Sequence, residues 1–167
     1  MSDISHLDFE LSDELKALTS EFDAKPKYVA IVSPIEYPDL FAAFAICCGV
    51  NGKIIAGKYA GEKVTVLFMN NPEERAGEKA AKNLLEHIDG LTLLLVAYKL
   101  GKLVVKEYFD SNLEAKDFVP TMFISGVSSE LEEIFLGSKT IDDFEYFDLS
   151  KMTISKAEKI LQKYRIS

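Results

Sequence analysis

One segment of the chain carries most of the residues of a phosphate-binding loop. Gly52, Gly57 and Lys58 have the spacing at which a glycine-rich loop wraps a phosphate and a lysine neutralises it. That motif needs Ser or Thr as its next residue, to hold magnesium, and Tyr59 occupies the position. The loop must also lead from a strand into a helix, whereas residues 53–59 have the composition of a strand entering a hairpin. We therefore predict a strand here and no nucleotide site.

The cysteines and histidines are too few for a metal centre or a catalytic triad. Cys47 and Cys48 are neighbours whose side chains diverge on a helix or a strand, and we interpret them as small apolar residues. A nucleophilic thiol would need a base beside it, which sequence does not show. Of the two histidines, His6 lies near the N-terminus and His87 ends a predicted helix, where a cation suits the helix dipole. We predict no catalytic residue, no metal and no cofactor.

Carboxylates are the abundant chemical group of this chain. Asp142, Asp143, Glu145 and Asp148 could hold a hard cation loosely, but the spacing and the central glycine of a calcium loop are missing. A solvated acidic face is the simpler interpretation. Acids from distant parts of the sequence could still converge in a pocket, so the sequence leaves an enzyme open as an alternative.

Length and composition predict one globular domain over residues 1–167. The chain is 48% hydrophobic and 28% charged, close to globular averages. Its net charge of −8 disfavours binding to the phosphates of nucleic acids and to anionic membranes. The longest apolar run, residues 91–98, is far shorter than the ~20 residues that span a bilayer. We expect a cytoplasmic protein with no nucleic-acid or membrane partner.

The N-terminal residues predict a first helix rather than a targeting signal. Ser12 can cap a helix on which Leu11, Leu15, Leu18 and Phe22 form an apolar stripe. Residues 1–10 are expected to be mobile. The acidic start lacks the basic and apolar regions of a signal peptide.

Strand patterns recur through the first two thirds of the chain. Residues 28–33 are apolar and rich in strand formers, which predicts a strand buried on both faces. Two hairpins are predicted, 53–59 with 63–69 about Ala60-Gly61, and 91–98 with 102–109 about Leu100-Gly101. Residues 39–48 are ambiguous: Pro38 and three alanines favour a helix, while a strand paired through Asn51-Gly52 is the alternative.

Capping signals predict three further helices. Asn71 as cap, Pro72 at the first helical position and small residues near Gly77 predict a helix that approaches the sheet closely and ends at Gly90. Ser129 with Glu132 predicts a helix ending near Gly137, and Ser155 with Glu158 predicts a terminal helix up to about Arg165. Residues 110–127 read as irregular, with a possible short strand over 121–125.

These elements predict an α+β fold. The hairpins imply antiparallel pairing, and the strand–helix–strand step could add one parallel pair. We expect a mixed, mostly antiparallel sheet of about five strands, flanked by helices.

Charge is unevenly distributed along the chain. Residues 107–150 hold eleven acids against two lysines, whereas residues 151–167 hold five bases and one acid. The terminal amphipathic helix over 151–167 therefore either folds back over its acidic neighbour or meets a partner. The candidate interaction residues are Phe144, Tyr146 and Phe147 among the acids, and Ile154, Ala157, Leu161 and Tyr164 on the terminal helix.

The dearth of reactive side chains favours a non-enzymatic interaction or assembly module, such as an adaptor, a scaffold or a chaperone-like subunit. Its partner would be another protein or a second copy in a homodimer. The alternative is a small enzyme or a small-molecule sensor with a pocket between a helix and the sheet. That pocket would use carboxylates together with Tyr28, Tyr59, Tyr98 or Tyr108.

Overall fold

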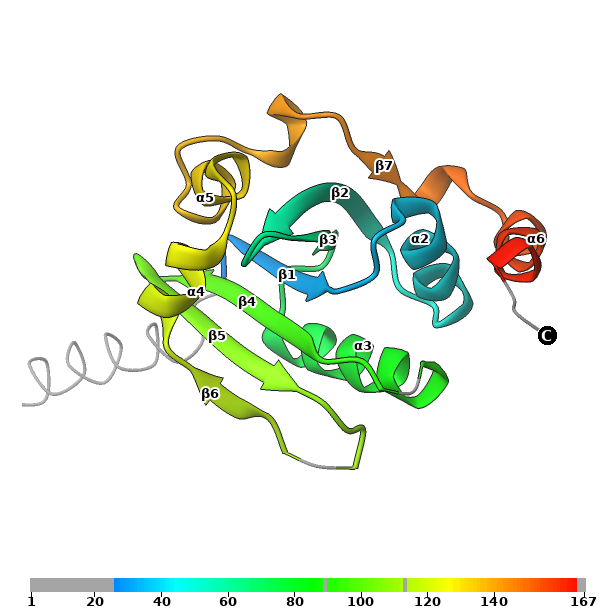
Figure 1. Ribbon diagram of the computed structural model, residues 1–167, viewed down its shortest axis with the longest axis horizontal. Helices are drawn as coiled ribbons and strands as arrows, with labels where there is room; N and C mark the ends of the chain where they lie inside the picture. Colours follow the sequence, from blue (N-terminus) through cyan, green and yellow to red (C-terminus); the bar gives the residue numbers. More distant parts are fainter. Residues whose placement is uncertain (1–25, 89, 113, 165–167) are drawn as a thin grey trace, which may run out of the picture.

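The computed structural model describes residues 26–88, 90–112 and 114–164 (Figure 1). The predicted first helix from Ser12, the terminus 1–10, His6, and the end of the terminal helix at Arg165 all lie outside the described residues. No helix within these described ranges is both long enough and apolar enough to cross a bilayer.

The described strands form one seven-stranded sheet in the order β6-β5-β4-β1-β3-β2-β7, and every pairing is antiparallel. The strands are β1 (Tyr28–Ser33), β2 (Gly52–Tyr59), β3 (Glu62–Met69), β4 (Leu93–Lys99), β5 (Lys102–Tyr108), β6 (Lys116–Phe118) and β7 (Phe147–Asp148). The α+β class is confirmed, but the count of about five strands and the parallel pair are wrong. The extra strands, β6 and β7, are edge strands too short for any period. The parallel pair is absent because β3, rather than β2, lies beside β1.

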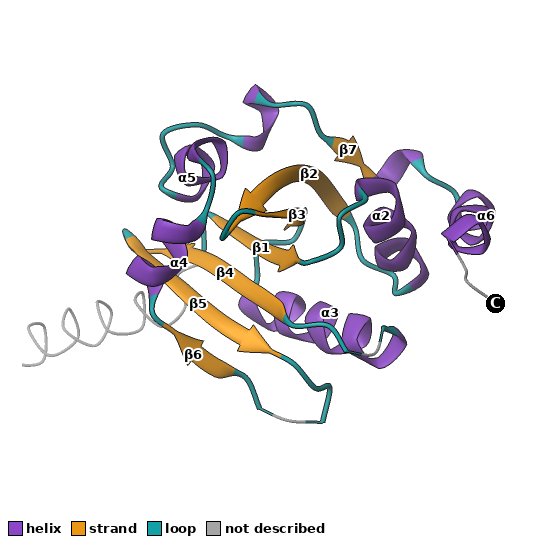
Figure 2. Cartoon of the chain, viewed as in Figure 1, coloured by secondary structure: helices purple, strands orange, loops and turns teal. Residues whose placement is uncertain are grey.

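Helices cover both faces of the sheet (Figure 2). They are α2 (Pro38–Cys47), α3 (Glu74–His87), α4 (Pro120–Gly126), α5 (Ser129–Phe135) and α6 (Ile154–Tyr164), with 3₁₀ turns at Ile141–Asp143 and Leu149–Lys151. α2 settles residues 39–48 as helix, the preferred prediction. α4 occupies the region where a short strand over 121–125 was expected, which is wrong: Pro120 starts a helix there instead.

Each face of the sheet carries its own hydrophobic core. Val29 and Ile31 of β1 point to the face covered by α2 and α3, where they meet side chains such as Phe41 and Leu84. Ala30 and Val32 point to the face covered by α4 and α5, which supply Phe123 and Phe135. β1 is thus buried on both faces, as predicted, because successive side chains of a strand alternate.

Both predicted hairpins are present, with turns that need a left-handed backbone at each central residue. Ala60 and Gly61 have φ of 52° and 81°, and Leu100 and Gly101 have φ of 53° and 75°. Positive φ at both positions matches the twist of the flanking strands. The close approach of α3 is also confirmed, since a Cβ on Gly77 would lie 2.5 Å from Cγ1 of Val29.

The predicted N-terminal helix caps are misplaced by one or two residues. α3 begins at Glu74 after Glu73, so Asn71 is not its cap and Pro72 is not its first residue. α5 begins at Ser129 itself, with Ser128 before it and no capping side chain. Thr153 caps α6 in place of Ser155: its Oγ1 accepts a hydrogen bond of 3.1 Å from the amide of Lys156. Adjacent serines and threonines compete for such positions, and tertiary contacts decide between them.

Candidate functional site

The α2 helix is apolar around its whole circumference. Its sequence, PDLFAAFAIC, has one charged residue, and Phe41, Ala42 and Ala45 are fully buried on the side that faces the sheet. Leu40 and Phe44 lie on other sides of the helix and are half-buried. A helix that is hydrophobic all round has to be covered on both sides. The sheet covers one side of α2, and a second element has to cover the other.

The α6 helix provides this second cover, as a further layer outside α2 (Figure 1). Ala157 is fully buried, and Ile160 and Leu161 pack against the same core. Lys156, Lys159 and Lys163 are exposed. The basic helix therefore folds back onto its own chain, with α2 as its main neighbour.

A hydrogen bond and a ring contact connect the end of α6 to the start of α2. The Tyr164 hydroxyl donates a hydrogen bond of 3.0 Å to Oδ1 of Asp39, and the other carboxylate oxygen lies at 3.3 Å. The Tyr164 ring packs against that of Tyr37 with centroids 5.2 Å apart. Burial, followed by the hydrogen bond to Asp39, raises the pKa of Tyr164. The Tyr164 hydroxyl therefore keeps its proton, and can donate this hydrogen bond, at neutral pH.

A groove remains between these two helices because α6 covers α2 only in part. The α2–α6 groove has a volume of about 520 Å³ and is lined by Leu40, Phe44, His87, Glu158, Leu161, Gln162 and Tyr164. Its apolar side chains come from α2 and α6, and its polar ones lie on α6 and at the end of α3. Apolar lining with a few polar groups is typical of a binding site.

Cys48 and His87 lie beside this groove, but they do not form a catalytic pair. Nδ1 of His87 is 3.7 Å from Sγ of Cys48 and 2.8 Å from the carbonyl oxygen of Asn83. Because a carbonyl only accepts, Nδ1 carries the proton and has no lone pair for the thiol. Burial, with smaller contributions from Cys47 and Glu86, raises the pKa of Cys48 to about 11. The thiol is therefore mainly neutral at pH 7, and the thiolate is the nucleophilic form.

The candidate interaction residues fall into two groups. Ala157, Leu161 and Tyr164 face α2, while Ile154 at the start of α6 is 64% exposed. Phe144 and Phe147 are half-buried against the cores of opposite sheet faces. Tyr146 is 41% exposed, with the ammonium of Lys53 4.6 Å from its ring centroid. Leu161 and Tyr164 thus line the groove, whereas Ala157 is buried and Ile154 is outside the lining. The second group belongs to the segment around β7, which pairs with β2 at the edge of the sheet.

Sequence reasoning missed the residues that α2 and α3 contribute to the groove. Leu40, Phe44 and His87 come from segments that were read as core or helix end. The composition of α2 could have predicted this groove. A helix that is apolar on all sides needs a second cover, and the amphipathic helix near the end of the chain is a candidate for it.

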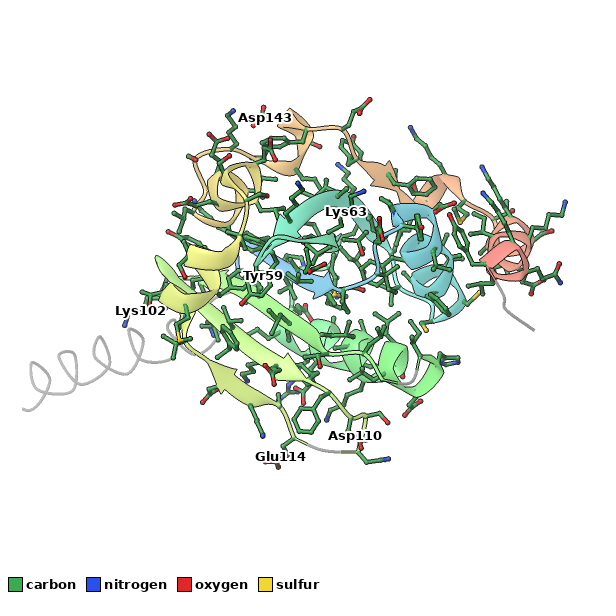
Figure 3. The ribbon with its side chains drawn as sticks, in the orientation of Figure 1. Tyr59, Lys63, Lys102, Asp110, Glu114 and Asp143 are labelled. Carbon is green, nitrogen blue, oxygen red and sulfur yellow. The ribbon has the colours of Figure 1, made fainter. Side chains whose placement is uncertain are left out.

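Other candidate chemistry does not assemble in the described part of the chain. No three His, Cys, Asp or Glu side chains there could share a metal ion. Gly52 to Lys58 lie within β2, so the loop geometry of a phosphate site is absent. Figure 3 places Asp143 at one end of the molecule and Asp110 and Glu114 at the other, so the acids of residues 107–150 do not form one site.

The four tyrosines of the alternative interpretation do not converge either. Tyr28 and Tyr98 stack with ring centroids 6.1 Å apart. Tyr59 instead packs on Phe123, and Tyr108 is buried in the core of the opposite face. The described residues therefore form no pocket that combines all four tyrosines, although Tyr59 lines a separate pocket together with Glu36 and Glu62.

Comparison of the chain with protein-family models, with curated protein sequences and with solved structures gives no match.

Proposed function

We propose that the protein is a non-enzymatic interaction module whose α2–α6 groove receives an apolar segment of another protein. The observation that carries this proposal is that the described residues cover α2 only in part. Leu40 and Phe44 lie in an open groove although α2 has almost no polar residue to face water. An amphipathic helix laid into such a groove would complete the burial, as in helix-in-groove recognition.

Exposed lysines on α6 favour an acidic flank on the partner. Lys156, Lys159 and Lys163 project from α6 into solvent, within a terminal segment that is basic while the chain as a whole is acidic. These lysines are outside the groove lining, in which the charged residue of α6 is Glu158, so they would meet the flank of a partner helix that extends beyond the groove and would favour an acidic flank over a basic one. The expected partner segment has apolar anchors at helical spacing and Asp or Glu beside them.

The edges of the sheet support a helix groove rather than strand addition. β6, with Lys116 and Asp117, covers part of β5, and β7 pairs with Lys53 and Ile54 of β2. At the other end of β2, the amide of Ser128 donates to the carbonyl of Lys58 at 2.9 Å. Short, charged edge strands are a usual way to prevent edge-to-edge pairing.

We further propose that the protein is cytoplasmic and that its partner is a protein, with neither nucleic acid nor membrane bound. A second copy of the chain is the other candidate occupant of the groove. The enzyme or sensor alternative is supported by two separate pockets, one lined by Tyr59 with Glu36 and Glu62 and one lined by Tyr28 with three lysines.

Affinity capture from the native cell with matched leucine variants tests this function. Leu161→Lys places a charge in the groove, and Leu136→Lys places the same charge on α5, where the leucine is 47% exposed. We expect the first variant to lose the partner and the second to keep it. Gln162→Trp, which fills the groove from an exposed position, should also lose the partner without removing a packing contact. Equal capture by all these proteins would contradict the proposal.

A further inference from the structure

A second hollow lies on the sheet face covered by α5, away from the α2–α6 groove. This pocket, here called the lysine pocket, has a volume of about 440 Å³. Its lining includes Lys27, Lys53, Lys139, Tyr28, Phe68 and Ile141. The three lysines come from the residue before β1, from β2 and from the loop after α5. The fold therefore gathers them from positions far apart in the sequence.

The lysine pocket is positively charged in a negatively charged protein. The chain has a net charge of −8, yet none of the described residues that line this pocket is acidic. Three like charges around one hollow repel each other, and nearby carboxylates or a bound anion relieve this repulsion. Nζ of Lys27 lies 5.7 Å from the centroid of the Tyr98 ring, and the other two lysines have carboxylate partners.

Two of the lysines are held by carboxylates outside the lining. Nζ of Lys53 lies 2.9 Å from Oδ1 of Asp142, and Nζ of Lys139 lies 3.1 Å from Oε2 of Glu133. The Asp142 and Glu133 side chains are 66% and 43% exposed. Exposed ion pairs contribute little stability, and lysine has a long flexible stem, so either ammonium can turn to a bound anion at small cost.

The floor of the lysine pocket is aromatic and aliphatic. The rings of Tyr28 and Phe68 meet edge to face with centroids 5.6 Å apart, and Ile134 and Ile141 complete the apolar surface. The Tyr28 hydroxyl donates a hydrogen bond of 2.6 Å to the carbonyl of Phe135, which fixes the ring. Burial, with a smaller effect from Tyr98, raises the pKa of Tyr28, so this ring adds no negative charge.

We propose that the lysine pocket binds a small organic anion, whose carboxylate or phosphate group meets the lysines and whose flat apolar body lies on Tyr28, Phe68 and Ile141. Neither part of such a ligand alone should bind tightly. The charged group alone buries no apolar surface, and the apolar body alone forms no ion pair with the lysines. This site is independent of the α2–α6 groove and of the partner proposed for it.

Titration of the full-length protein with three probes tests the proposal. The probes are phenyl phosphate, inorganic phosphate and benzyl alcohol, followed through the isoleucine methyl NMR signals of Ile134 and Ile141. We expect phenyl phosphate to bind about tenfold more tightly than either half-ligand, and its affinity to fall as salt is added. Benzoate tests the carboxylate head group: binding of either aryl anion supports the site, and binding of neither overturns it.

Matched lysine variants separate this pocket from general surface charge. Lys53→Gln with Lys139→Gln should weaken phenyl phosphate about tenfold, while Lys63→Gln with Lys102→Gln, which removes the same charge elsewhere (Figure 3), should change its affinity less than about twofold. Asn70→Phe, a substitution of an exposed lining residue, should block binding with the charge unchanged. Equal losses in the two lysine pairs, or benzyl alcohol binding as tightly as phenyl phosphate, would overturn the proposal.

Discussion

At the scale of single residues, the clearest feature is a buried hydroxyl without a partner. Thr65 on β3 is fully buried, and its Oγ1 makes no hydrogen bond with any described residue. Its cross-strand neighbour Ser33 is equally buried, but its Oγ accepts a hydrogen bond of 3.0 Å from the amide of Ile35. The two hydroxyls therefore differ in hydrogen bonding while they share an environment.

Thr65→Val should raise the free energy of unfolding by about 1 kcal/mol, because it removes an unsatisfied hydroxyl with little change in shape. Ser33→Ala, the matched control, should lower that free energy by about 1 kcal/mol because Ile35 loses its acceptor. Urea unfolding at pH 7 measures both. A destabilised Thr65→Val would show that the hydroxyl has a partner after all.

Buried tyrosines predict a loss of stability in alkali. Burial, with smaller effects from Glu78 and Glu74, raises the pKa of Tyr108 to about 12. The unfolded tyrosine ionises near pH 10, so between about pH 10 and 12 the unfolded state loses protons that the folded state keeps. The contribution of Tyr108 is therefore complete below pH 10 and is lost as the pH rises through its folded pKa.

The matching measurement is urea unfolding of the wild type and of Tyr108→Phe from pH 7 to pH 11.5. The free energy of unfolding of the wild type should fall more steeply above pH 10 than that of the variant, with the values at pH 7 as reference. Parallel curves would contradict the shift at Tyr108.

At the scale of elements, the position of α6 outside α2 predicts that substitutions on its two faces have different effects on stability. Leu161 packs on the core and lines the α2–α6 groove, whereas Ile154 on the same helix is 64% exposed. Leu161→Ala should lower the free energy of unfolding by about 1–2 kcal/mol, since partial burial gives part of the cost of a core truncation. Ile154→Ala should change it by less than about 0.5 kcal/mol. Equal effects in thermal or urea unfolding would mean that α6 does not rest on α2 as described.

The elements that the sequence predicts well are those with local signals. Both hairpins follow from alternating strands around Ala60-Gly61 and Leu100-Gly101, and α3 follows from its small residues at helical spacing. The edge strands β6 and β7 could not be predicted, because two or three residues show no period and pairing with a neighbour creates them. α4 was missed because Thr121 to Ser125 are as compatible with a strand as with a helix, and packing of Phe123 on the sheet decides.

The candidate sites were less predictable than the fold because both depend on distant contacts. The amphipathic face of α6 could be predicted from sequence, but Leu40 and Phe44, which line the groove beside it, lie more than a hundred residues earlier. Lys27, Lys53 and Lys139 are unremarkable singly, and only the register of the sheet and the path after α5 place them around one pocket.

At the scale of the whole molecule, the two hollows lie on different sides of a sheet whose edges are partly covered. One is apolar, between α2 and α6, with Glu158 in its lining and lysines exposed elsewhere on α6, and the other is lined by lysines, between the sheet and α5. We propose negatively charged partners for both, although the chain is acidic. Attraction to such partners should therefore be local and should weaken with salt, since screening acts over about 8 Å at physiological ionic strength.

Site-specific photocrosslinking in the native cell is the measurement that tests the central claim most directly. A crosslinking amino acid at Gln162, in the α2–α6 groove, is compared with one at Glu130, exposed on α5. The account predicts an adduct from position 162 alone, joined to an amphipathic segment with acidic residues on its flank. No adduct from position 162, or the same adduct from both positions, would contradict it.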